Sequence, residues 1–212
     1  MQQIAQAFSD GGIFMYIIIL PSIAGLAIII ERIVALYFKY NINAHSFMAQ
    51  IQKLVMANNI DRAIKLCNAA PNKALPRVVK AGLTRANKGE LEISNAIEEA
   101  ILEVVPQVQK RVPQLQGIAN VATLMGLLGT IIGLIQAFSA LDKASPDQRG
   151  AYLAKGISVA MYTTAFGLIV AVPCMIAHLF LAATVKKITD EIDLYSVKLE
   201  NLLISRLRSG GM

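Results

Sequence analysis

Four threonines in strongly apolar surroundings are the side chains of this sequence best placed for chemistry. Thr123 and Thr130 lie seven residues apart in one uncharged stretch, which puts them on one face of a helix, and Thr163 and Thr164 lie in the middle of another. A single threonine can bond to its own helix and indicates little alone. Four hydroxyls at a similar depth could line a polar path for an ion.

Acids are missing from the same stretches, so an ion path would need an acid from a partner. His178 lies in the third of these stretches, and it could either relay protons or only reach the membrane interface. His45 has no companion for a metal site, and Cys67 and Cys174 lie far apart in unlike surroundings. The sequence predicts no metal, no cofactor and no disulfide framework. It also contains no nucleophile set or phosphate loop, so we do not expect an enzyme.

The composition of the 212 residues is that of a membrane protein: 55% hydrophobic, 16% charged, with a mean hydropathy of +0.54. Three stretches of 20, 30 and 30 residues carry no charge, and about 20 apolar residues cross a bilayer as a helix. We predict an all-α membrane protein with transmembrane helices at 13–35, 118–141 and 157–185. The segments between and around them are 1–12, 36–117, 142–156 and 186–212.

Lysine and arginine orient these spans. None precedes the first span, 12 lie between positions 32 and 111, three lie between 142 and 155, and five follow position 185. The positive-inside rule therefore places 36–117 and 186–212 in the cytoplasm, and 1–12 and the 142–156 loop in the periplasm. The net charge of +6 is then explained by topology and by anionic membrane lipid, and no nucleic acid is expected as a partner.

The cytoplasmic segments are predicted to form long helical extensions. Two apolar stripes are separated at Asn58-Asn59, and a longer helix starts near Leu91, with Ser94 as a possible N-cap and bends at Pro106 and Pro113. The last helix has a coiled-coil seam that could pack on the 90–112 helix or on copies of itself. Its members are Ile188, Ile192, Tyr195, Leu199 and Leu202.

Small residues form one face on each of the second and third spans. Such faces let helices approach closely, either inside a bundle or against a partner's helix. They are Gly126, Gly129 and Gly133 in the second span, and Ala160, Thr164, Gly167 and Ala171 in the third.

The order of these residues resembles a known family. Residues 118–138 read IANVATLMGLLGTIIGLIQAF, and residues 156–173 read GISVAMYTTAFGLIVAVP. Both stretches resemble the second and third span signatures of the MotA/TolQ/ExbB family of ion-driven inner-membrane proteins. The resemblance covers about residues 13–200, and three spans with a periplasmic N-terminus are similar to the TolQ/ExbB branch.

This resemblance implies a homo-oligomeric, pentameric ring in the bacterial inner membrane. The ring would enclose an ExbD/TolR-like single-span partner whose membrane Asp carries the ion, and could drive a TonB- or TolA-like protein. Thr130 and Thr164 match hydroxyls that face that Asp, with Thr163 beside them. The residues implied to pack on the partner's helix are Gly126, Gly129, Gly133, Ala160, Gly167, Ala171 and Pro173.

Two positions depart from the family pattern. Val159 stands where a Glu is usual, and Thr123 stands where a Pro is usual. Val159 with Thr163-Thr164 is partly similar to the stator branch, some members of which use sodium. The ion, proton or sodium, and the driven system therefore stay open. Two alternative functions are a non-conducting membrane scaffold and a motility stator subunit.

Overall fold

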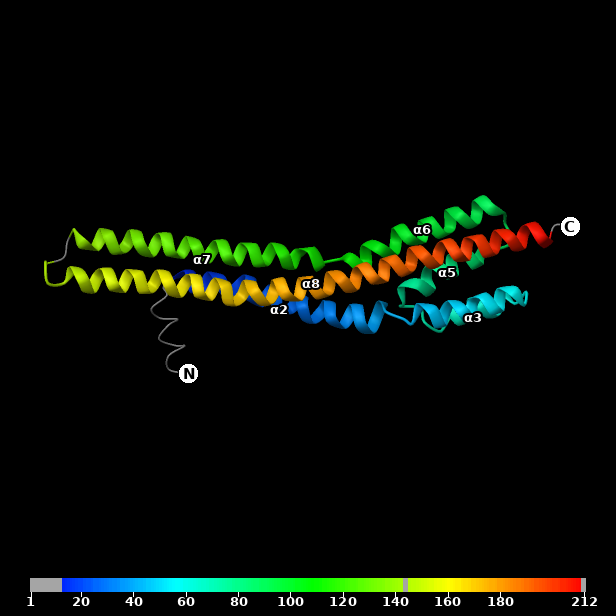
Figure 1. Ribbon diagram of the computed structural model, residues 1–212, viewed down its shortest axis with the longest axis horizontal. Coiled ribbons are helices and arrows are strands. Elements are labelled where there is room, and N and C mark those ends of the chain that lie inside the picture. The colour runs from blue at the N-terminus through cyan, green and yellow to red at the C-terminus, as the bar shows by residue number, and fades with distance from the viewer. Residues whose placement is uncertain (1–12, 143–144, 211–212) are drawn as a thin grey trace. The chain divides into compact units, whose positions relative to one another are not determined.

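The computed structural model describes residues 13–142 and 145–210, and every regular element among them is helical (Figure 1). Three helices are long and apolar enough to cross a membrane: α2 (Ile13–Val34), α7 (Val112–Leu141) and α8 (Arg149–Gly210). The predicted all-α fold with three long apolar helices is confirmed. The predicted 1–12 segment, and 143–144 of the 142–156 loop, lie outside the described residues.

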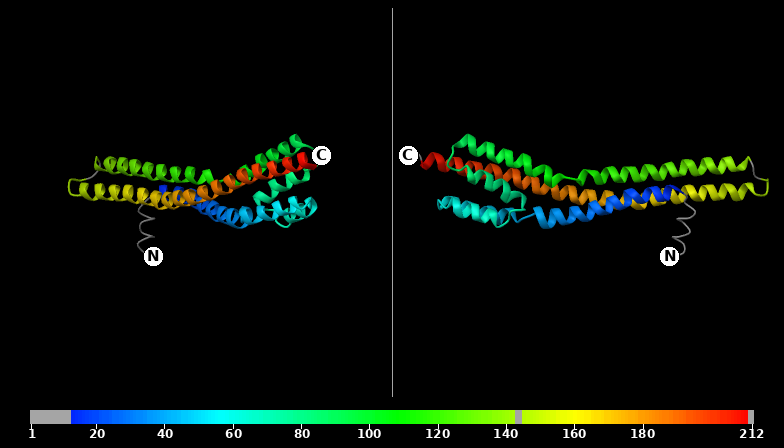
Figure 2. Two further views of the ribbon diagram at one scale, coloured as in Figure 1. Left: turned by 45° about the vertical axis from the view of Figure 1, so that its right-hand side comes forward. Right: turned by 180° about the vertical axis from the view of Figure 1, so that it is seen from behind.

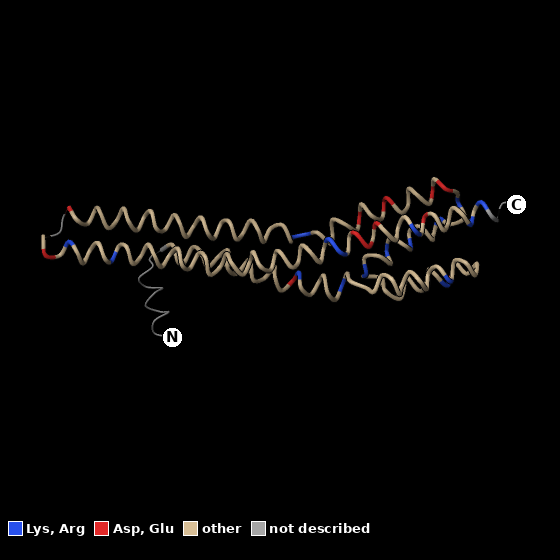
Figure 3. Tube along the Cα trace, in the orientation of Figure 1, with Lys and Arg blue, Asp and Glu red and all other residues tan. Residues whose placement is uncertain are grey.

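The chain divides into two compact units. We call residues 13–31 and 111–180 the span unit, and residues 32–110 and 181–210 the extension unit. The elements of the extension unit, besides the end of α8, are η1 (Ala35–Tyr40), α3 (Ala44–Met56), α4 (Ile60–Asn68), α5 (Ala74–Thr84) and α6 (Glu90–Gln109). Figure 3 shows α7 without lysine, arginine, aspartate or glutamate between its ends, whereas the extension unit carries many of both signs.

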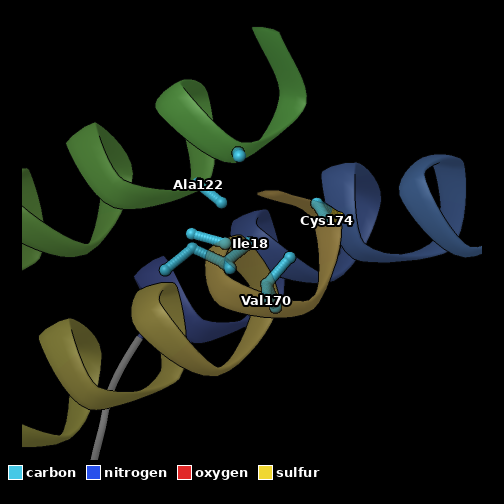
Figure 4. Packing of buried hydrophobic residues seen from close by; sticks show 6 residues of the cluster. Ile18, Ala122, Val170 and Cys174 are labelled. Atoms are coloured by element: carbon cyan, nitrogen blue, oxygen red, sulfur yellow. The ribbon is translucent and has the colours of Figure 1, made fainter. Parts of the chain in front are cut away.

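Within the span unit, α2, α7 and α8 share one apolar core (Figure 4). Ile18 of α2, Ala122 of α7, and Val170 and Cys174 of α8 are all buried in it. The contacts are close because small residues face each other: a Cβ added to Gly25 would lie 2.7 Å from the Cys174 sulfur. The three spans therefore pack as one bundle.

The boundary between α6 and α7 falls between the two prolines that were expected to bend one helix. Pro106 lies inside α6, and Pro113 lies in the first turn of α7, where its missing N–H breaks no intrahelical bond. Arg111, the N-cap of α7, has a φ of 63° and forms an ion pair with Glu31 of α2. The predicted bend at Pro113 is therefore wrong, because a helix break precedes this residue, and the bend at Pro106 stays a prediction.

The extension unit confirms the predicted helical stripes. Met48, Ile51 and Val55 of α3 are buried, and so are Ala63 and Cys67 of α4. The two helices are separated at the expected break, where Asn58 has a φ of 60°.

Helix α6 begins near the predicted residue but with a different cap. Gly89, with a φ of 109°, precedes its first residue Glu90. The prediction of Ser94 as N-cap is wrong, because Ser94 lies more than one turn inside the helix. Its hydroxyl instead donates a hydrogen bond of 2.7 Å to Glu200 of α8.

The predicted seam of the last helix is partly confirmed. Ile188, Ile192 and Leu199 are buried, but Ser196 and Leu203 are buried in place of Tyr195 and Leu202. The seam packs inside the chain: a Cβ on Gly82 of α5 would lie 2.8 Å from Ile97 of α6 and 3.3 Å from Leu199. In Figures 1 and 2, the end of α8 runs beside α6. Of the two arrangements considered, the structure favours packing on the 90–112 helix.

Candidate ion-path site on helices α7 and α8

Glycines bring the backbones of α7 and α8 into direct contact. A Cβ added to Gly126 would lie 3.1 Å from the Thr163 carbonyl oxygen and 3.3 Å from the Gly167 Cα. One added to Gly167 would lie 2.8 Å from the Ala122 carbonyl oxygen. A Cβ at Gly167 therefore has no room, and one at Gly126 would require the facing backbone to shift by a few tenths of an ångström. The glycines fix the distance at which α8 presents its threonines to α7.

Thr163 is buried in this contact. Its side chain fills the space that Gly129 leaves, since a Cβ on Gly129 would lie 2.7 Å from both the Cβ and the Oγ1 of Thr163. The residue is 1% exposed, and its hydroxyl donates to the carbonyl of Ala160 at 2.9 Å. In this structure Thr163 therefore presents no surface to a partner.

Thr164 makes the polar contact between the two helices. Its hydroxyl donates to the Gly126 carbonyl of α7 across 3.3 Å. In an α-helix the Gly126 carbonyl also accepts the backbone N–H of Thr130, four residues later. The Thr164 hydroxyl and the Thr130 N–H therefore bond to the same carbonyl of α7. Both residues are half-buried. The hydroxyl of Thr130 donates to Leu127 of its own helix at 2.5 Å. The two predicted hydroxyls thus bond to neighbouring carbonyls of α7, those of Leu127 and Gly126, whereas Thr163 is buried and bonds within α8.

Thr123, the fourth hydroxyl, is satisfied locally. It lies two turns from Thr130 and donates to the Ala119 carbonyl at 3.0 Å. Its side chain needs no second helix, so its bond fits a packing role as well as an ion path.

His178 makes a second contact of the same kind. Its Nδ1 lies 3.0 Å from the Val112 carbonyl oxygen of α7. A carbonyl can only accept, so Nδ1 carries the proton and donates. His178 lies 14 residues after Thr164, and Val112 lies 14 residues before Gly126, so both contacts belong to one antiparallel register. The bond provides a structural role for His178, and its relay role stays a prediction.

The residues predicted to pack on a partner's helix lie in three environments. Five pack α7 on α8 within one chain: Gly126, Gly129, Gly133, Ala160 and Gly167. Ala171 belongs to the three-helix core, and Pro173 is an exposed residue inside α8. The structure assigns the first six to packing within the subunit, and their contact with a partner stays a prediction.

Two features of the span unit were not found from the sequence. Gly25 and Cys174 form the close contact of α2 with α8, and Glu31 pairs with Arg111. Glu31 directly follows one charge-free stretch, and Arg111 directly precedes another. Their places at the ends of these stretches were the signal that could have predicted the pair. Among the described residues, no three His, Cys, Asp or Glu side chains are grouped to hold a metal ion.

The profile of the MotA/TolQ/ExbB proton channel family matches residues 70–194, more than half of the chain. This chain belongs to that family. Its three apolar helices make it a multi-pass membrane protein. A protein of Methanothermobacter thermautotrophicus, named as a biopolymer transport protein ExbB homologue, is 26% identical over 90% of this chain and 66% of its own length.

Shorter stretches of the chain are similar to proteins named ExbB and TolQ. The biopolymer transport protein exbB1 of Vibrio cholerae is 34% identical over 41% of this chain and 40% of its own. The Tol-Pal system protein TolQ of Haemophilus influenzae is 33% identical over 45% and 42%. The chain thus spans less than two thirds of the length of these three relatives. The C. jejuni MotAB structure aligns with 90% of this chain and 83% of its own at a TM-score of 0.48 and 14% identity.

Proposed function

We propose that this chain is the ring-forming subunit of a proton-driven channel that does mechanical work through a smaller partner. The observation that carries the proposal is the contact of Thr164 with the turn of α7 that holds Gly126 and Thr130, inside stretches without any acid. A hydroxyl pair in such a place can solvate a charge that another protein brings. The proposed partner is ExbD/TolR-like, with one span and one membrane Asp.

The chemistry follows from the cost of burying a carboxylate. An ionised Asp among apolar helices needs hydrogen-bond donors, and the hydroxyls of Thr164 and Thr130 can turn from their backbone carbonyls to supply them. Once protonated, the Asp no longer requires these donors and can leave. A proton crossing about 100 mV releases roughly 2.3 kcal/mol, which is comparable to one such bond to a charged group. Cycles of protonation could therefore move the partner relative to a pentameric ring.

The proposed setting is the inner membrane, with the N-terminus in the periplasm and the extension unit in the cytoplasm. This orientation rests on the positive-inside distribution of lysine and arginine. The driven system could be of the TonB or Tol type, and the ion is proposed as the proton because of the family match.

A non-conducting scaffold is the second candidate. It is favoured by the bonds of all four hydroxyls to backbone carbonyls of the same chain, which leave the subunit complete without an ion. It is also favoured by the use of the small-residue faces for packing within the chain.

Ion flux separates the two candidates. The chain would be purified with its single-span partner, placed in liposomes under a pH gradient and a membrane potential, and followed with an internal pH dye. A channel gives uptake that is lost when the partner's Asp is changed to Asn with assembly unchanged. A scaffold gives no uptake above that of protein-free liposomes under any gradient.

A further inference from the structure

Helix α7 exposes polar side chains inside its charge-free stretch. Asn120 and Thr123 are exposed, and Gln116 is half-buried. The amide nitrogen of Gln116 donates a hydrogen bond of 3.2 Å to the side-chain oxygen of Asn120, one turn further along the helix. We call Gln116, Asn120 and Thr123 the polar stripe. Gln116 and Asn120 have no role in the ion-path site described above.

The polar stripe leads to Thr130. Its members and Thr130 follow one another by four, three and seven residues, so they share one face of the helix. The stripe starts near the charged end of α7, where Arg111 pairs with Glu31. Along the helix axis, Gln116 lies about 7.5 Å from Arg111 and Thr130 lies about 28.5 Å from it. The stripe therefore joins the charged end of α7 to the turn that carries the candidate site.

The other half of this face is apolar. Leu134 and Phe138 continue it beyond Thr130 in steps of four, and both are exposed. The polar residues of that half, Gln136 and Ser139, lie on the opposite side of the helix, because each residue turns the helix by about 100°. The face that carries Thr130 is thus polar toward one end of the helix only.

Exposed amides in an apolar span need hydrogen-bonding partners. The Asn120 amide nitrogen has none among the described residues. An unbonded amide is costly in lipid, so polar side chains of membrane helices face a protein interior or a water-filled cavity. Either water or a polar group on another helix can satisfy Asn120. The one-sided polarity favours water, because a group that exchanges protons beside Thr130 needs a hydrated route to one end of the helix.

We propose that the polar stripe lines a water-filled half-channel that carries protons between the turn of Thr130 and the charged end of α7. The inference rests on the proposed function, because it supplies the route by which the partner's Asp exchanges its proton. The protonated carboxyl gives its proton to a water molecule, and the proton passes from water to water along the stripe to the solvent. In the proposed orientation, that solvent is the cytoplasm.

Leu127 interrupts the polar side chains once. It lies between Thr123 and Thr130 on the same face and is 53% exposed. An apolar constriction excludes water and so closes a pore. Leu127 therefore keeps the half-channel from leaking when the partner's carboxyl is not beside it.

Cysteine accessibility tests for water along the stripe without measuring transport. The chain's own Cys67 and Cys174 are both buried, so the unmodified protein is the blank. The full-length Asn120→Cys variant, in nanodiscs with its single-span partner, is treated with a charged methanethiosulfonate reagent. This reagent reaches the thiol only through water, and it reacts with the thiolate, which water stabilises and lipid does not.

Two positions provide matched controls. Leu134 lies on the same face about 12 Å from Asp142, as Asn120 lies about 13.5 Å from Arg111, so both are at similar depths from opposite ends. Val121 is the next residue after Asn120 and is 42% exposed, but it lies off the stripe. Asn120→Cys should react about tenfold faster, or more, than Leu134→Cys and Val121→Cys, because only its thiol is solvated.

Proton uptake by liposomes tests whether the stripe carries the ion. Asn120→Leu should slow uptake about tenfold, the effect of about one lost hydrogen bond along the path. Asn120→Gln keeps the amide and should retain uptake. Val121→Leu, off the stripe, should leave uptake unchanged. Assembly with the partner is measured for each variant and should not differ.

The two readouts separate this inference from the proposed function. Normal uptake in Asn120→Leu, or equal reaction of Asn120→Cys and Leu134→Cys, would overturn the half-channel and leave the proposed function standing. Protection of Asn120→Cys when the partner is added to the chain would also overturn it, since the partner's helix and not water would then cover the stripe. Absence of uptake by the unmodified complex would overturn both, because the half-channel would have no proton to carry.

Discussion

Replacing Gly167 by alanine should separate α7 from α8. The new Cβ would lie 2.8 Å from the Ala122 carbonyl oxygen and 3.0 Å from the Gly126 Cα, and both are backbone atoms that no side-chain rotation can move away. Gly117→Ala is the matched control, because a Cβ there has nothing within 4 Å. Both substitutions gain the same helix propensity, about 1 kcal/mol.

The difference between the two variants therefore isolates the overpacking term. Overpacking a close contact costs about 1 to 3 kcal/mol, so Gly167→Ala should be less stable than Gly117→Ala by that amount. Unfolding in mixed micelles with increasing dodecyl sulfate, followed by far-UV circular dichroism, measures both. If Gly167→Ala proves as stable as Gly117→Ala, the two helices do not approach as closely as described, and Thr164 is not held against Gly126.

Two further predictions concern the extension unit. Leu199→Asp should destabilise the unit by more than about 3 kcal/mol, because Leu199 is 0% exposed. Leu194→Asp, at a site that is 51% exposed, should cost under about 1 kcal/mol. Limited proteolysis compares the two variants, and equal resistance to the protease would contradict the assigned seam. Burial raises the pKa of the Cys67 thiol from an ordinary value near 9 to about 12. The unfolded chain loses this proton first, so the contribution of Cys67 to stability is complete below about pH 9 and is lost as the pH rises toward 12. Cys67→Ala should reduce the loss of stability at alkaline pH. An unfolding free energy that falls with pH in the same way in the variant and the unmodified protein would refute this prediction.

The elements were predictable where one physical signal dominated. Charge-free stretches as long as a bilayer is thick defined the three apolar helices, because burying a charge in lipid is costly. The buried stripe of Met48, Ile51 and Val55 followed from helical periodicity alone. Helix α7 begins at Val112, directly after the left-handed Arg111, and contains the predicted span of 118–141. Where the membrane begins along this helix stays a prediction.

The sequence predicted which apolar helices carry the candidate site residues, but not which groups those residues contact. The sequence indicates that Thr130 and Thr164 lie in apolar helices, but not which carbonyl each hydroxyl meets, since that depends on the register of α7 against α8. The register is set by Gly126, Gly129 and Gly167, whose faces fit either a second helix of the same chain or a partner's helix. Similarly, the seam shifted from Tyr195 to Ser196 because contacts with α5 and α6, not a strict heptad, determine which residues are buried.

The measurement that tests the central proposal most directly is proton uptake by liposomes holding the partner complex of the Thr164→Val variant. The methyl group keeps the shape and removes the donor, at a cost to an ionised partner Asp of about 1 to 3 kcal/mol. Two variants serve as controls. Thr164→Ser keeps the donor. Thr189→Val removes a hydroxyl that donates to the Val185 carbonyl, and Thr189 lies beyond the charge-free stretch. We predict that uptake is lost in Thr164→Val and kept in both controls, with assembly unchanged in all three. Normal uptake in Thr164→Val would contradict the assignment of this hydroxyl to the ion path.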